Sequence, residues 1–139
     1  MGMEVLSSRI LIRPVDPGRS RRFYRDTLGL AIYREFGPPD DPGLVFFLGQ
    51  SLLEVSGRAE EPTGGGAGRV RLWLQVRDLA AEHHRLAAAG VPIVRDPQRE
   101  PWGLDEMWIE DPDGIPIVVV EIPPEHPLRR DQRGARTEP

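Results

Sequence analysis

Hydrophobic and polar residues alternate in several short stretches, which is the pattern of strands with one buried face. The segment 4–13 has an apolar face and a charged face. Further short runs, bounded by proline or glycine, follow at 30–36, 44–48 and 51–56. Residues 19–28 carry apolar side chains at helical spacing, and Gly29 is placed to end that helix. The pattern predicts the order βαβββ.

The same order occurs a second time. Residues 70–76 alternate as a strand, Asp78 is placed to cap a helix over 79–89, and Gly90 is placed to end it. Three more strands are predicted at 91–95, 106–110 and 115–122. The last two are joined by DPDG at 111–114, which has the composition of a type I turn.

The two halves also match residue by residue. An offset of 62 places residues 9–12 on 71–74 and Asp16 on Asp78, and an offset of 61 places Gly29 on Gly90. Two such units cannot bury their apolar faces separately, so we expect them to pair with their sheets around a shared cleft. The fold class is α+β. The predicted parts are a first βαβββ unit, a glycine-rich linker, a second βαβββ unit and a flexible tail, over 1–56, 57–69, 70–122 and 123–139.

Composition narrows the possible functions. The net charge of −4 does not indicate a nucleic-acid surface. Cysteine is absent and all 18 basic residues are arginine, so thiolate chemistry, Schiff bases and a P-loop lysine are excluded. No apolar run approaches membrane-spanning length and no leader pattern is present. We expect a soluble cytoplasmic protein.

Two motifs resemble a known family. FYRDTLGL at 23–30 and WIEDPDG at 108–114, together with the paired βαβββ units, resemble the vicinal oxygen chelate superfamily. That superfamily includes glyoxalase I, extradiol dioxygenases and bleomycin-resistance proteins, and the resemblance covers about residues 4–122. It implies a half-open barrel of eight strands and a homodimer.

The resemblance also implies where a metal would bind. Enzymes of the superfamily hold a divalent metal with side chains from the first and fourth strands of each unit, and the matching residues here are Arg9, Glu54, Arg71 and Val118. Only Glu54 can ligate a metal, because arginine stays protonated and valine has no donor atom. We therefore expect no metal and no other cofactor. The histidines are expected at exposed helix or tail positions: His83, His84 and His126.

The residues at the metal positions allow two interpretations. Arg9 and Arg71 come from equivalent strands and should flank Glu54. The three side chains could form a charge-paired plug that fills the cleft. Alternatively, they form a polar floor that recognises an anionic or hydrogen-bonding ligand through the arginine donors. The two interpretations are compatible.

Aromatic residues favour a ligand. Strand alternation places Trp73 with Arg71, and Trp108 with Glu106, on the face that lines the pocket in the glyoxalases that this chain resembles. The pair Trp102-Gly103 is similar to one in bleomycin-resistance proteins. Of the adjacent residues Phe46 and Phe47, one should face the cleft, and we assign Phe47. Several aromatic rings near one concave surface suit a flat, partly apolar compound.

We therefore predict a protein that sequesters a small planar or aromatic compound without a metal, as in antibiotic resistance. Its predicted ligand-binding residues are Arg9, Phe47, Glu54, Arg71, Trp73, Trp102, Glu106 and Trp108. One alternative is a lyase, isomerase or oxygenase with a rearranged metal site, or a metal-free acid–base catalyst using Glu54 or Glu106. Another is an interaction module whose cleft is plugged.

Overall fold

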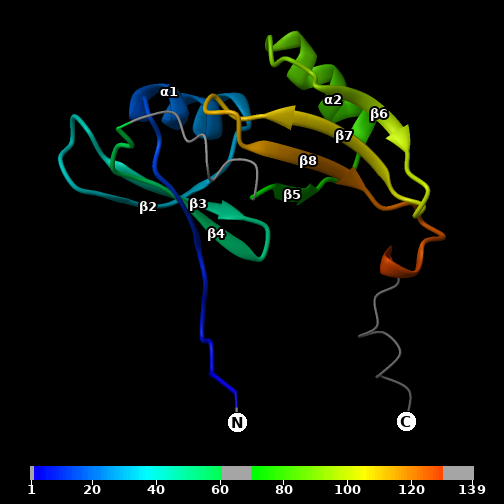
Figure 1. Cartoon of the computed structure of the whole chain (residues 1–139), viewed down its shortest axis with the longest axis horizontal. Coiled ribbons are helices and arrows are strands. Elements are labelled where there is room, and N and C mark those ends of the chain that lie inside the picture. The colour runs from blue at the N-terminus through cyan, green and yellow to red at the C-terminus, as the bar shows by residue number, and fades with distance from the viewer. Residues whose placement is uncertain (1, 61–69, 130–139) are drawn as a thin grey trace. The chain divides into compact units, whose positions relative to one another are not determined.

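The computed structural model describes residues 2–60 and 70–129. Contacts divide the chain into two compact units, residues 1–70 with 111–115, and residues 71–110 with 116–139. Each unit holds one four-stranded sheet, so the α+β fold of two βαβββ units is confirmed (Figure 1). The half-open barrel around a cleft stays a prediction. Most of the predicted linker 57–69, and the predicted tail from 130 onward, lie outside the described residues.

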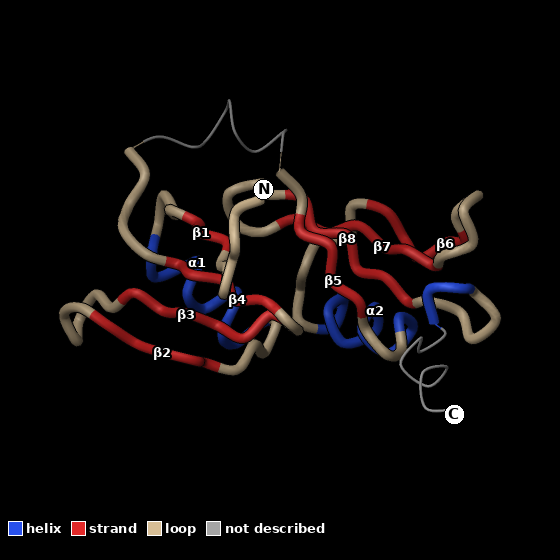
Figure 2. The backbone as a smooth tube through the Cα atoms, turned by 90° about the horizontal axis from the view of Figure 1, so that it is seen from below, coloured by secondary structure: helices blue, strands red, loops and turns tan. Residues whose placement is uncertain are grey.

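The first unit has a mixed sheet with the strand order β1-β4-β3-β2, and Figure 2 shows these strands side by side. Strand β1 runs parallel to β4, and the other neighbours are antiparallel. Alternation along β3 buries Phe46 completely and leaves Phe47 47% exposed. The ring of Tyr24 packs 6.3 Å from that of Phe46, so the helical segment covers the Phe46 face. The elements are β1 (Ile10–Ile12), α1 (Pro17–Arg22), the π-helix η1 (Phe23–Thr27), β2 (Ile32–Phe36), β3 (Gly43–Leu48) and β4 (Ser51–Val55).

The second unit repeats this topology with the strand order β5-β8-β7-β6. Strand β5 runs parallel to β8, and helix α2 packs against β6, β7 and β8. No helix within residues 2–60 and 70–129 is both long enough and apolar enough to cross a membrane. The elements are β5 (Leu72–Gln75), α2 (Leu79–Ala88), β6 (Arg95–Arg99), β7 (Asp105–Glu110), β8 (Pro116–Glu121) and the 3-10 turn η2 (Pro127–Arg129).

Equivalent residues of the repeat have equivalent structural roles. The side chain of Asp16 accepts a hydrogen bond from the backbone N–H of Arg19 (3.1 Å) and caps α1. Asp78 caps α2 in the same way, and its acceptor oxygen lies 3.0 Å from the backbone nitrogen of Ala81. Gly29 and Gly90 follow the helical segments with φ of +74° and +82°, a region that favours glycine. The internal repeat read from the sequence is confirmed.

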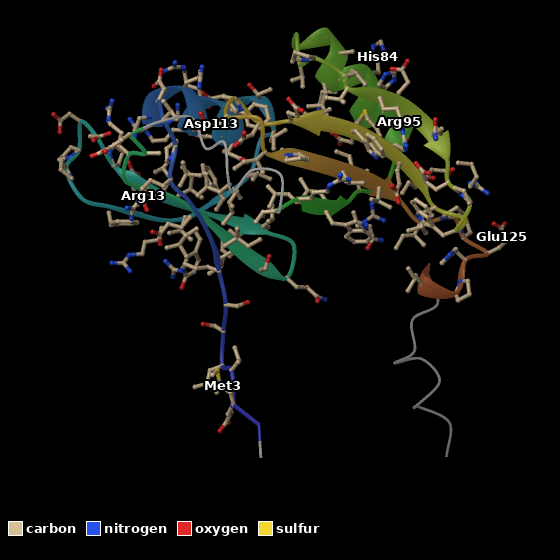
Figure 3. All side chains as sticks on the ribbon, in the orientation of Figure 1. Met3, Arg13, His84, Arg95, Asp113 and Glu125 are labelled. Atoms are coloured by element: carbon tan, nitrogen blue, oxygen red, sulfur yellow. The ribbon has the colours of Figure 1, made fainter. Side chains whose placement is uncertain are left out.

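The strand predicted over 4–13 is much shorter than expected. Only Ile10–Ile12 pair with a neighbour, in register with residues 53–55 of β4. Residues 2–9 are exposed and form no strand, because no strand in the described part of this unit forms backbone hydrogen bonds with them. Met3 lies on this segment (Figure 3), and 89% of its surface is exposed. Alternation in sequence is therefore not sufficient for a strand.

Two other predicted boundaries were wrong. The strand expected at 91–95 begins at Arg95 instead, because the backbone N–H of Val91 still bonds to the carbonyl of Leu86 and closes the helix. The helix expected over 19–28 changes type after Arg22, and the N–H of Leu28 bonds back five residues to Phe23. The other predicted elements agree with the structure to within two residues at each end.

Candidate functional site

In the first unit, Arg9 and Glu54 form the predicted contact. Nη1 of Arg9 donates to Oε1 of Glu54 at 2.8 Å, and the Ser56 hydroxyl donates to Oε2 at 2.6 Å. The Glu54 side chain is 13% exposed and that of Arg9 is 34% exposed. The Ser56 hydroxyl and the Arg9 guanidinium lower the pKa of Glu54, so the carboxylate is ionised near neutral pH. Both of its oxygens already have donors.

Phe47 lies on the same face of this sheet as Glu54. Val45 is the register partner of Glu54, and Phe47 follows it by two residues along β3. The ring of Phe47 makes an edge-to-face contact with Tyr33, with centroids 5.2 Å apart. Half-exposed aromatic rings beside a charge pair therefore occupy this face.

In the second unit, one row of side chains crosses all four strands. Trp73 of β5 is in register with Val118 of β8, Val118 with Trp108 of β7, and Trp108 with Arg95 of β6. Register partners point to the same face of a sheet. The next row on that face contains Gln75, Val120, Glu106 and Gln98. Trp73, Trp108 and Glu106 thus share one face, as strand alternation predicted.

Arg95 is a member of this row that sequence reasoning missed. Its guanidinium carbon lies 3.8 Å from the centroid of the Trp108 ring, close enough for a cation–π contact. Its Nη2 pairs with the carboxylate of Glu100, whose side chain is only 5% exposed. The signal was available in the repeat, since the offset of 61 that aligns the glycines also places Arg34 on Arg95. Arg34 makes a similar contact with Phe36 in the first unit, at 5.8 Å.

Arg71 precedes β5 and is exposed. Its guanidinium carbon lies 5.9 Å from the Trp108 centroid, so two arginines approach one indole ring. Within the described part of its own unit, Arg71 forms no ion pair. Its predicted pairing with Glu54 would join the two units and remains a prediction.

Trp102 is held by residues on both sides. Its indole nitrogen donates to Oε2 of Glu106 at 2.8 Å, and Glu106 is buried. Its carbonyl oxygen lies 3.1 Å from Nε2 of His126. The backbone N–H of Leu128 donates to Nδ1 of His126, so in the neutral ring Nε2 carries the proton and donates to Trp102.

His126 was expected to be an exposed tail residue, and this expectation was wrong. A Cβ atom on Gly103 would lie 3.1 Å from the His126 ring, and Gly103 has a φ of +91°. Only glycine lets the ring lie this close with that backbone conformation. The start of the predicted tail is therefore packed on the Trp102-Gly103 loop.

The residues at the family's metal positions do not fit a metal. Arg9 donates to Glu54, and Val118 belongs to an apolar cluster with Leu104, Val120 and Ile122. Across residues 2–60 and 70–129, no group of three or more His, Cys, Asp or Glu side chains is arranged to hold an ion. The donor set is cationic, apolar or already engaged, so these positions provide no metal chemistry.

Comparison with known proteins gives the same fold. A family model described as the glyoxalase/bleomycin resistance protein/dioxygenase superfamily matches residues 7–119. No curated protein sequence matches the chain significantly.

Several solved structures are similar. TnmS3, an antibiotic binding protein from Streptomyces sp. CB03234, has a TM-score of 0.69 and 21% identity, over 88% of this chain and 99% of that one. A lactoylglutathione lyase from Agrobacterium tumefaciens gives 0.64 and 21%, over 87% and 96%. A superfamily member from Sphaerobacter thermophilus gives 0.62 and 25%, over 86% and 97%. A binding protein and a lyase are thus similar to this chain in fold.

Proposed function

Because the chain belongs to the glyoxalase/bleomycin resistance protein/dioxygenase superfamily, we propose that it binds a small planar or aromatic compound without a metal ion. In this proposal the chain sequesters the compound as a cytoplasmic homodimer and does not transform it. The predicted binding residues are Arg9, Phe47, Glu54, Arg71, Trp73, Trp102, Glu106 and Trp108, to which the structure adds Arg95 as a neighbour of Trp108.

The observation that carries the proposal is the row Trp73, Val118, Trp108 and Arg95 on one face of the second sheet. Trp73 is 50% exposed, although exposing an indole to water is unfavourable. Aromatic faces combined with a few fixed donors are typical of ligand sites. This row contains two aromatic side chains and one arginine with hydrogen-bond donors.

Metal independence is supported by the chemistry of the donor set. Arg9 and Arg71 would repel a divalent cation, and Glu54 already accepts two hydrogen bonds. The lyase and dioxygenase chemistry of the superfamily depends on such a metal, so these residues favour binding over catalysis. The antibiotic binding protein with the same fold is an analogy for this role and supplies no ligand identity.

Metal-free acid–base catalysis has less support. Glu54 is ionised and engaged by two donors, and Glu106 is bonded to the indole of Trp102. A general base must be able to reach the proton of a substrate. Both carboxylates already accept hydrogen bonds from other side chains in this structure.

Native mass spectrometry of protein purified from its host tests the proposal. We expect a non-covalent organic ligand at about one per chain, lost from the Trp73→Ala variant and retained by the Arg99→Lys variant, a control on the same sheet whose exposed side chain pairs with Asp105. Elemental analysis of the same sample should find no stoichiometric zinc, iron, nickel or manganese. One such metal per chain, lost with Glu54→Ala, would contradict the proposal, as would turnover of the bound compound.

A further inference from the structure

Two buried nitrogen atoms beside the Trp108 ring have no acceptor. Within the described part of the second unit, Nε1 of Trp108 and Nε of Arg95 are the buried side-chain donors without a hydrogen-bond partner. The guanidinium lies 3.8 Å from the indole centroid, so both N–H groups belong to one small region. Buried donors in native proteins nearly always have partners. This pair is therefore suited to an acceptor that comes from outside the chain.

The surrounding charges determine which acceptor fits. Glu100 neutralises Arg95 through their ion pair, and Glu106 is bonded to the Trp102 indole. Arg71 approaches the same ring at 5.9 Å and has no acidic partner in the described part of its unit. Arg71 and Arg95 are thus the cations beside the Trp108 ring, while Glu106 is the acidic side chain of the next row on this face. A guanidinium N–H forms a stronger hydrogen bond with an anionic oxygen than with a neutral one.

The flanking side chains determine the shape of the ligand. Trp73 and Trp108 stand on either side of Val118, two strand spacings or roughly 9–10 Å apart. Val118 is small and apolar, so it leaves space between the two larger indole side chains. An aromatic ring lying on this row would place a substituent at its edge next to Trp108 and Arg95.

We propose that the ligand is a planar aromatic anion, a carboxylate or phenolate, whose oxygen accepts hydrogen bonds from Nε1 of Trp108 and Nε of Arg95. This inference rests on the proposed function and names the class of compound that the same face recognises. Both donors are covered in this structure. The exposed Arg71 side chain beside the ring moves aside to admit the oxygen and then pairs with its charge.

The experiment is a titration followed by the indole N–H signals of 15N-labelled protein. The chain has three tryptophans, so Trp73→Phe and Trp102→Phe assign two signals, and the third belongs to Trp108, which is left unchanged. The two probes have the same naphthalene ring system. The first, 2-naphthoate, carries an anionic acceptor, and the second, 2-naphthylmethylammonium, carries only donors and a positive charge. Calorimetry gives both affinities.

We expect 2-naphthoate to bind at least about tenfold more tightly than the ammonium compound, the factor for one charge-assisted hydrogen bond. The Trp108 N–H signal should move downfield by more than the other two. Arg95→Lys, which keeps the charge but removes Nε, should lose most of this preference. Arg99→Lys on the same strand, whose exposed side chain pairs with Asp105, should keep it.

Three results would overturn the inference. Equal binding of both probes with shifts confined to Trp73 and Trp102 would leave aromatic binding intact but remove the acceptor. A Trp108 signal already at a hydrogen-bonded position in the free protein, and unmoved by naphthoate, would show that water satisfies the donor. Absence of binding of either probe up to millimolar concentration would also reject it, while the proposed function would still be judged by the ligand that co-purifies.

Discussion

The hydroxyl of Tyr24 donates a hydrogen bond to Oδ2 of Asp111 at 2.9 Å, across 87 residues of sequence. Tyr24 is completely buried, and burial raises its pKa, so the hydroxyl keeps its proton and acts as the donor. The other oxygen of Asp111 accepts the N–H groups of Asp113 and Ile115 and shapes the turn. The two motifs that suggested the family, FYRDTLGL and EDPDG, therefore meet in one contact.

The first prediction concerns this contact. Tyr24→Phe should lower the free energy of unfolding by about 1–2 kcal/mol, because Asp111 loses a buried donor while the ring remains. Tyr33→Phe is the matched control, since its ring is half-exposed and contacts Phe47 only at the surface. That change should stay within about 0.5 kcal/mol. Urea denaturation of both variants measures the difference, and equal values would show that the buried hydrogen bond contributes nothing.

The second prediction concerns acid. The pKa of Glu54 is lowered by the Ser56 hydroxyl and by Arg9, so between this pKa and about 4.3 the unfolded chain binds more protons. The stabilisation is present above about pH 4.3 and is lost as the pH falls through the lowered value. Glu54→Gln should therefore destabilise the protein at pH 7 and flatten the fall in stability toward pH 3. The free energy of unfolding of both proteins is measured by urea denaturation between pH 7 and pH 3. The same fall with pH in the two proteins would contradict this prediction.

The third prediction concerns the loop under His126. Gly103→Ala should destabilise the protein by roughly 1 kcal/mol more than Gly114→Ala, although both glycines have positive φ. A Cβ on Gly114 meets open space, whereas one on Gly103 meets the His126 ring at 3.1 Å. In a His126→Ala background this extra cost should disappear. A cost that persists there would place the strain in the backbone alone.

The fourth prediction concerns assembly. We expect a homodimer, and the described edge strand β1 carries Leu11 with 64% of its surface exposed, which a partner can cover. Light scattering should give twice the 15.6 kDa of one chain at micromolar concentrations. A mass of one chain would reject the dimer.

The fold was largely predictable because the residues that begin and end its helices act through local contacts. Asp16 and Asp78 cap helices, and Gly29 and Gly90 adopt positive φ, whatever surrounds them. The strand over 4–13 failed because a strand needs a neighbour, and sequence alternation does not supply one. These two outcomes separate local from non-local information in the chain.

The site was predictable only in part, for the same reason. The contact of Arg9 with Glu54 was expected because the family resemblance placed both residues at metal positions, on the first and fourth strands of the unit. Arg95 was missed because the register of β6 with β7 is irregular between Arg95 and Gln98, where Pro97 has no N–H to offer. A shift of one residue changes the face that a side chain occupies. The His126 contact was missed because the tail composition carries no periodic signal.

The turn at 111–115 belongs by its contacts to the first unit, although its sequence lies in the second repeat. A fragment ending at residue 60 would therefore bury Tyr24 without an acceptor and would leave Arg19 without Asp113. A fragment beginning at residue 70 would carry the turn without the helix that it contacts. Neither half is a self-sufficient folding unit in this respect, and split-gene complementation of the two halves should depend on Asp111.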